Sequence, residues 1–405
     1  MGLKLRPFCF QDDILKVNKT KTEAQLTQKV IYDTVSSKTL EFNLDKCTVL
    51  IHGKGMLSKL ERSVYASDPV LTGPAITPLV TKDKYLGDTL HETDLNECFR
   101  ETVKSRIPKV KGAIAEIMAV VEDIKATNLQ PIRVGLDLWN KVVLPMVLYN
   151  SNPWIQIKEK DYSVIETLQY DFLRRLLQAP KHTLRAGILW ETGQWPMRMR
   201  IMMSKIMLYR HLVCLPVSSV AKQIFDAETY EIEGLKFEVT MFCHMNSIPL
   251  PTVTSEKDEY RKLVTKRLEV VIANELRSKL AASSNMAGTE RGKFEIQSYM
   301  QHGSLGFCRQ LFAYRVGTTT EFVGNRFGQQ INRLCLCGRA FETSSHITRC
   351  ALYSECEAGL RDRVNNFSEC MLYWDRVVEK KRRLLERMPR PTLDSSTASR
   401  SDDSS

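Results

Sequence analysis

The chain has 405 residues, which is room for two or three domains of ordinary size. Hydrophobic residues make up 43% and charged residues 26%, so most of the chain is expected to bury a core rather than stay disordered. Lysine and arginine outnumber aspartate and glutamate by 58 to 47, a net charge of +11 that makes nucleic acid or an acidic membrane surface the first partners to consider.

No apolar run approaches the roughly 18–20 residues that span a bilayer, and the N-terminus lacks the apolar stretch of a signal peptide. We therefore expect an intracellular protein with no membrane partner. The 11 cysteines are an odd number and mostly scattered, which argues against a disulfide framework and leaves a late cysteine cluster to be explained.

The first 15 residues predict a β-hairpin, because two short apolar runs flank a polar turn. Asp12 and Asp13 lie at the tip of this hairpin. Two adjacent carboxylates suit Mg²⁺, a hard cation that takes oxygen ligands and that polymerases use in pairs. The alternative is an ordinary surface turn, since Asp-Asp is common in turns.

The rest of residues 1–92 has a mixed pattern. Residues 21–37 have helical spacing, with Thr22 and Gln25 as a capping box. Residues 47–51 are rich in β-branched side chains and predict a strand, and residues 85–87 predict one more short strand.

From about residue 93 the pattern changes to long helices, predicted at residues 94–127, 160–178 and 197–213. The methionines of the last of these helices are expected to pack in the core. The expected order of regions is a mixed α and β region at 1–92, long helices at 93–215, a mainly helical region at 216–330, a cysteine-rich segment at 331–360, a basic helix at 361–390 and a disordered tail at 391–405.

Several short motifs follow one another in a fixed order. They are Phe10-Gln-Asp-Asp13, Leu40-Glu-Phe-Asn-Leu-Asp-Lys46, Lys84-Tyr-Leu-Gly87, and then residues 143–150, 176–180 and 190–193. The first three resemble the palm of a reverse transcriptase. Together with the late cysteine cluster, the whole series resembles the polymerase proteins of LINE-type (non-LTR) retrotransposons, from residue 2 to about residue 360.

The resemblance implies an α+β chain, with a small N-terminal partial palm followed by a mainly α-helical thumb and C-terminal region. It implies that Asp12 and Asp13 bind catalytic Mg²⁺ and that Lys46 lies near the incoming nucleotide. Tyr85 and Gly87 match the primer grip, and the helices that follow, to residue 150, match the thumb that holds the primer–template duplex. RNA-templated DNA synthesis is the parent reaction.

The chain also departs from the family pattern. Gln11 stands where many members have alanine, and the palm motif lies so near the start that the fingers and a further metal-binding aspartate have no counterpart. Because two carboxylates of one hairpin do not make a two-metal site, we expect binding of RNA or DNA without polymerisation by this chain alone. The alternatives are an active polymerase completed by a missing N-terminal segment or a second chain, and a host-adopted nucleic-acid-binding protein.

The late cysteine cluster has the spacing of a metal site. Cys335, Cys337, His346 and Cys350 place four sulfur and nitrogen ligands within 16 residues, which suits a tetrahedral structural Zn²⁺. Cys356 is an alternative ligand, because two sulfurs separated by a single residue are a tight arrangement. The other interpretation is a chance group of buried thiols. Members of the resembled family often carry such a Cys-Cys-His-Cys knuckle near this position.

A second feature is the density of positive charge in residues 174–211, where eight cations face one acid, Glu191. The cations are Arg174, Arg175, Lys181, Arg185, Arg198, Arg200, Lys205 and Arg210. Aromatic residues lie among them, a mixture that suits a nucleic-acid backbone with stacked bases or, equally, a core with a solvated charged face. A further basic run at residues 380–383 is typical of a nuclear-import signal or of a basic helix end.

Overall fold

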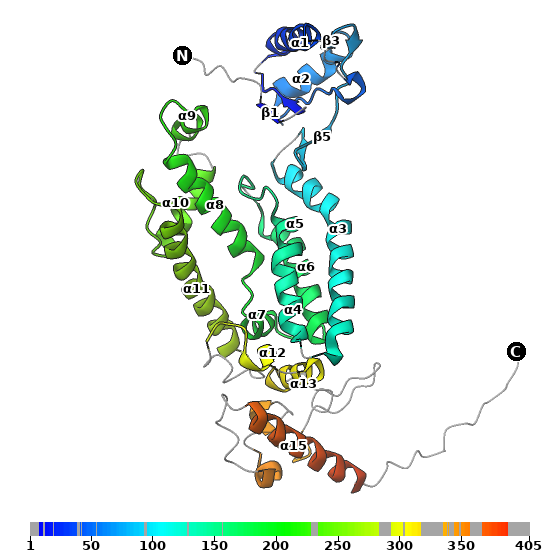
Figure 1. The fold of residues 1–405 in the computed structure, drawn as a ribbon, viewed down its shortest axis with the longest axis vertical. Helices are drawn as coiled ribbons and strands as arrows, with labels where there is room; N and C mark the ends of the chain where they lie inside the picture. The colour runs from blue at the N-terminus through cyan, green and yellow to red at the C-terminus, as the bar shows by residue number, and fades with distance from the viewer. Residues whose placement is uncertain are drawn as a thin grey trace, which may run out of the picture.

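The structure is a computed structural model whose described part is mostly α-helical, with three two-stranded antiparallel sheets (Figure 1). This agrees with a loose α+β class. The described residues are 8–10, 13–18, 20–38, 41, 43–53, 55–92, 95–127, 129–155, 157–227, 234–282, 293–302, 304–316, 335–337, 339, 344–347, 350–356 and 367–387. The predicted tail at 391–405 lies outside them.

All the strands of the described residues lie in the N-terminal region. Its elements are β1 (Phe8–Phe10), β2 (Asp13–Leu15), α1 (Lys21–Ser36), the 3₁₀ turn η1 (Leu44–Lys46), α2 (Met56–Tyr65), β3 (Leu71–Thr72), β4 (Ala75–Ile76), β5 (Lys82–Tyr85) and β6 (Asp88–His91). Each strand pairs with its neighbour in sequence, β1 with β2, β3 with β4 and β5 with β6. The predicted first hairpin is therefore confirmed, with Phe10 opposite Asp13.

Three details of this region differ from the prediction. Helix α1 is capped by Thr20, whose hydroxyl accepts the Glu23 N–H at 3.2 Å, rather than by Thr22. Residues 47–51 are not a strand; their only described bridge joins Val49 to Leu79. Residues 85–87 are not a separate strand. Tyr85 ends β5, and Leu86 and Gly87 form the two-residue turn to β6, both at positive φ as such hairpin turns require.

The helical body begins with α3 (Leu95–Asp123), α4 (Pro131–Leu138), the π-helix η3 (Trp139–Val143), α5 (Leu144–Leu148) and α6 (Glu159–Leu177). It continues with α7 (Arg185–Thr192), α8 (Met197–Val213), α9 (Val220–Ala227), α10 (Leu235–Met245), α11 (Lys257–Ala281), α12 (Ser298–His302) and α13 (Leu305–Arg315). Beyond these lie α14 (Ser344–Ile347), the 3₁₀ turn η5 (Ala351–Cys356) and α15 (Phe367–Arg387). The long helices predicted at 94–127, 160–178 and 197–213, and the basic helix predicted within 361–390, are all present.

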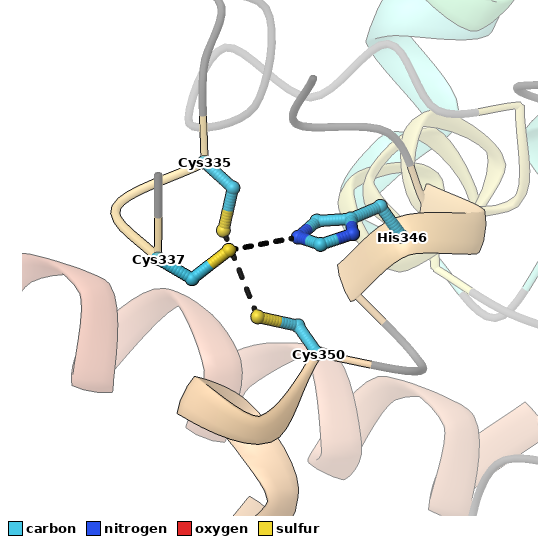
Figure 2. A group of neighbouring side chains, drawn as sticks. All are labelled: Cys335, Cys337, His346 and Cys350. Carbon is cyan, nitrogen blue, oxygen red and sulfur yellow. Dashed lines mark hydrogen bonds between the residues drawn. The ribbon is translucent and has the colours of Figure 1, made fainter. Parts of the chain in front are cut away.

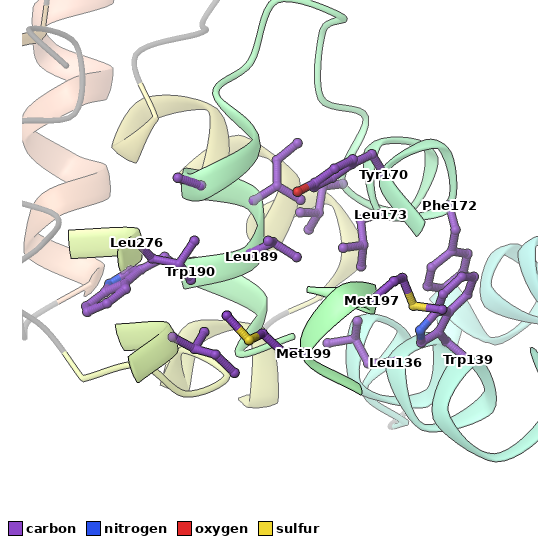
Figure 3. Packing of buried hydrophobic residues seen from close by; sticks show 14 of the residues in the cluster. Leu136, Trp139, Tyr170, Phe172, Leu173, Leu189, Trp190, Met197, Met199 and Leu276 are labelled. Atoms are coloured by element: carbon purple, nitrogen blue, oxygen red, sulfur yellow. The ribbon is translucent and has the colours of Figure 1, made fainter. Parts of the chain in front are cut away.

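One continuous apolar core joins α3 to α15. Within it Trp139 stacks on Phe172, with centroids 4.8 Å apart, and Met197 lies beside this pair (Figure 3). Met197 and Met199 are buried, which confirms that the methionines of α8 serve packing. Figure 1 shows α3 to α6 on one side, α8, α10 and α11 on the other, and α12 and α13 beneath both.

Candidate metal centre and basic surface

Four side chains that the sequence grouped also meet in space. The ligand atoms of Cys335, Cys337, His346 and Cys350 all lie within 4.8 Å of one another (Figure 2). They come from the turn at residues 335–337, from α14 and from the residue that precedes η5. Cys356 is buried in η5 and does not belong to this group, so the structure selects the first of the two ligand sets.

The spacing of the four atoms fits a tetrahedral metal. Zinc–sulfur bonds of about 2.3 Å and zinc–nitrogen bonds of about 2.0 Å place ligand atoms roughly 3.5–3.8 Å apart in a tetrahedron. In the structure the sulfurs of Cys335 and Cys350 are 3.8 Å apart, and Cys337 Sγ lies 3.3 Å from His346 Nε2. A metal ion therefore enters this group with small movements of the side chains.

The surroundings of the cysteines also favour the thiolate form of one of them, Cys337. The backbone N–H of Arg339 donates to Cys337 Sγ at 3.4 Å and lowers the pKa of the Cys337 thiol to about 6. Burial has the opposite effect on Cys335, whose pKa rises to about 12. A divalent cation would stabilise the thiolates against that burial, as metal binding to cysteine requires.

The metal group is packed against the C-terminal helix. Tyr353 and Cys356 of η5 are buried in the same core as Tyr373 of α15. The Lys380 ammonium of α15 pairs with the Glu355 carboxylate at 2.9 Å. The four ligands thus fasten a segment that supports α15.

The predicted carboxylate site is only partly within the described residues. Asp13 begins β2, whereas Asp12 and Gln11 lie outside them. Lys46 is exposed at the end of η1. In the part of the chain that the structure describes, no group of three or more acidic side chains gathers as a metal site.

The turn that contains Gly87 is fixed to the first long helix. Arg106 of α3 donates to the Gly87 carbonyl at 3.2 Å and to the Tyr149 carbonyl at 2.7 Å, and it pairs with Asp88. Its guanidinium also lies 5.5 Å from the ring centroid of Trp154. This arginine joins two of the sequence motifs, residues 84–87 and 143–150, although no spacing in the sequence singled it out.

The cations of α8 point to partners within the protein. Arg198 pairs with Glu275, Arg200 bonds Asn140 and Gln194, Lys205 pairs with Glu238, and Arg210 donates to the Ser255 carbonyl. Two of the aromatic residues among them, Trp190 and Tyr209, are buried and have no face to offer to a base. For α8 the structure therefore favours the packing interpretation over base stacking.

The remaining cations of the segment lie at the end of α6 and the start of α7. Arg175, Lys181 and Arg185 are exposed there, and Arg174 is half-buried. The Arg185 guanidinium lies over the Tyr170 ring, 4.5 Å from its centroid. We call these four residues, Arg174, Arg175, Lys181 and Arg185, the α6–α7 basic surface.

Comparison of the chain with protein-family models, curated protein sequences and solved structures finds no match. Within the described residues, none of the helices combines the length and the apolar character that crossing a membrane requires.

Proposed function

We propose that this chain is a zinc-containing protein that binds RNA or DNA. The observation that carries the proposal is the Cys335–Cys337–His346–Cys350 group, in which sequence spacing and spatial distance independently fit a tetrahedral Zn²⁺. A short metal-bound segment of this kind fixes a loop that has too little apolar surface to fold alone, and nucleic-acid-binding modules commonly use one.

The α6–α7 basic surface supports the choice of partner. Its cations stand without a described carboxylate in ion-pair distance, in a chain with a net charge of +11. Unpaired surface cations release condensed counterions when they meet a phosphate backbone, and this release supplies most of the sequence-independent binding energy. The basic run at 380–383, at the end of α15, suits import into the nucleus.

The LINE-type resemblance extends the proposal to the architecture. Residues 1–92 would be a partial palm with the Asp12–Asp13 hairpin, and α3 to α5 would be the thumb. Asp12 and Asp13 would bind Mg²⁺ only when another segment or chain supplies a further carboxylate. We therefore propose binding without polymerisation for the 405-residue chain by itself.

The metal is tested by elemental analysis of the purified chain. One zinc per chain is expected, and Cys350→Ser is expected to lose it. Cys356→Ser is the matched control, because Cys356 is also buried in this segment but lies outside the ligand group. Absence of zinc from the unmodified chain, or an unchanged zinc content in Cys350→Ser, would refute the metal centre.

Nucleic-acid binding is tested by fluorescence anisotropy with single-stranded RNA and DNA over a series of salt concentrations. The double variant Arg175→Ala/Lys181→Ala is expected to weaken binding and to reduce the salt slope by roughly 0.7–0.9 for each lost phosphate contact. Lys262→Ala/Arg267→Ala removes the same charge from exposed positions on α11 and should leave the slope unchanged. Equal slopes for the two variants would contradict the assignment of the surface.

The absence of polymerisation is tested by primer extension with Mg²⁺. We expect no extended product from the chain alone. Extension that Asp12→Ala abolishes would show that the chain is a working polymerase.

A further inference from the structure

A small polar pocket of about 260 Å³ lies between α4, η3 and the turn that follows α7. Asn140 of η3 and Gln194 of the turn line it, together with Arg133, Asp137, Gly193 and Gln301. The pocket is smaller than the roughly 300–1,000 Å³ of sites for drug-sized molecules, so its size suits a single small group.

The amides of Asn140 and Gln194 connect this pocket to the half-buried side chain of Arg200. Arg200 Nη2 donates to Asn140 Oδ1 at 3.3 Å and to Gln194 Oε1 at 3.1 Å. Arg200 Nε is buried and has no hydrogen-bond partner among the described residues. The guanidinium is therefore held by neutral groups and is incompletely satisfied.

Arg200 also lacks a counter-ion. No described carboxylate lies within ion-pair distance of it, whereas Arg198 and Lys205 on the same helix are paired with Glu275 and Glu238. Burial lowers the pKa of Arg200 to about 10, and no neighbouring acid opposes this effect. A buried charge without a partner is costly, and an anion that enters the site relieves that cost.

The chemistry of arginine determines how the two amides are oriented. A guanidinium donates and never accepts, so the oxygens of Asn140 and Gln194 face Arg200. Their amide nitrogens are thereby left as donors, because the hydrogen bonds that these two side chains make to described residues involve only their oxygens. Since both residues line the pocket, these donors are available to an occupant, and the nearby Arg200 charge strengthens them.

Local backbone features hold this arrangement in place. Asn140 lies in the π-helix η3, a type of irregular turn that often occurs at functional sites. Gly193 has a φ of +62°, and a Cβ there would lie 2.5 Å from the backbone N of Ile296. Only glycine allows the turn after α7 to approach residues 295–296 so closely and so complete the pocket.

We propose that this pocket binds a small oxyanion of the phosphate class, held by the amides of Asn140 and Gln194 and neutralised by Arg200. The exposed Arg133 at the pocket adds a second cation. Asp137, also exposed at the pocket, disfavours a highly charged anion and so favours one of low charge. The residues are different from those of the metal centre and of the α6–α7 basic surface. The inference therefore stands or falls independently of the proposed function.

The decisive variant is Asn140→Asp, which supplies the counter-ion that Arg200 lacks. It is expected to raise the melting temperature of the full chain and to weaken binding of inorganic phosphate at least about tenfold, measured by calorimetric titration. Arg200→Gln should also weaken phosphate binding at least about tenfold, because the charge itself is removed. Arg198→Gln is the control, since Arg198 is paired with Glu275 outside the pocket, and it should retain phosphate binding.

Because phosphate also stabilises proteins by exclusion from their surface, melting temperatures are compared with sodium sulfate and sodium chloride at equal ionic strength, and between variants. Phosphate should stabilise the unmodified chain more than Asn140→Asp, by an amount that grows with concentration. If phosphate does not bind the unmodified chain, or binds Asn140→Asp equally well, the proposal is overturned.

Parallel titrations identify the source of the phosphate group. If Asn140→Asp loses binding of both a nucleoside monophosphate and a short oligonucleotide, the pocket is assigned to a nucleic-acid phosphate. If Asn140→Asp loses binding of phosphate and of the mononucleotide while oligonucleotide binding is unchanged, the pocket is assigned to a free phosphate compound. Either result supports the oxyanion site.

Discussion

A buried ionic network joins α7 to α12 and α13, and its removal should be costly. Glu191 of α7 has no exposed surface and accepts two bonds of 2.8 Å from Arg315 of α13. Tyr299 of α12 donates to the same carboxylate at 2.9 Å. The three residues are 108 and 124 positions apart in sequence, so this network fixes the distant end of the helical body.

Replacement of Arg315 by methionine keeps much of the side-chain volume but leaves the Glu191 carboxylate buried with only the Tyr299 hydroxyl. Breaking a buried pair in this way costs about 3–5 kcal/mol, because an uncompensated charge remains. Tyr299→Phe removes one hydrogen bond to a charged group and should cost about 1.5–3 kcal/mol. Both losses are measured as changes in the free energy of unfolding in urea, followed by the fluorescence of tryptophans that include Trp190, beside Glu191.

The double variant Glu191→Gln/Arg315→Met separates the pair from the packing. A neutral amide retains a partner in Tyr299 and carries no charge, so the double variant should be more stable than Arg315→Met alone. The single variants Glu191→Gln and Arg315→Met are measured alongside it. If the double variant loses as much free energy of unfolding as these two single variants lose together, Glu191 and Arg315 do not interact, and the reasoning from the buried pair is wrong.

Three further predictions concern the packing of the helical body. Gly135→Ala should destabilise the chain by about 1–3 kcal/mol in urea unfolding, because the new Cβ would lie 2.8 Å from Leu176 Cδ1. The control Gly112→Ala, whose Cβ would have nothing within 4 Å, should stabilise the chain by about 0.5–1 kcal/mol. A stabilising Gly135→Ala would contradict the close approach of α4 and α6. Glu238→Gln should cost about 2–3 kcal/mol in the same assay, since it leaves the buried Lys205 charge without its carboxylate, and an unchanged stability would refute this pairing. Burial lowers the pKa of Lys205, so the folded chain releases that proton more readily than the unfolded chain. The stability of the unmodified chain, measured relative to Lys205→Met, should therefore rise as pH rises from the lowered pKa towards 10.5. A constant difference between the two chains across this range would count against the lowered pKa.

Periodicity predicted the helices well because their buried faces recur every three to four residues. Ile114, Ile117 and Val121 of α3 are buried as that spacing requires. The strand prediction at residues 47–51 failed for a different reason. β-Branched side chains favour extended backbone, but a strand also needs a paired neighbour, and only Val49 finds one there.

The candidate metal centre was the most predictable part of the site. All four ligands lie within 16 residues, so short-range geometry nearly determines their meeting. Arg106 and Arg200 were not predictable as contact residues, because Arg106 donates to residues 18 to 43 positions away and Arg200 contacts Asn140, 60 positions away. Most of their acceptors are also neutral groups, which carry no charge pattern in the sequence. The same limit applied to α8, where positive charge along the chain did not reveal which cations had acids on other helices.

Apart from Arg210, which donates to the Ser255 carbonyl, the cations of residues 174–211 therefore divide into three kinds with different chemistry. Arg198 and Lys205 are each neutralised by a carboxylate, and they contribute little to the field outside the protein. Three of the four cations of the α6–α7 basic surface are exposed, and several cations on one surface suit the repeated charges of an extended phosphate backbone. Arg200 is half-buried behind two amides that line a small pocket, a setting that suits one oxyanion. An arrangement of this kind lets one segment hold a polyanion and a small anion at separate places.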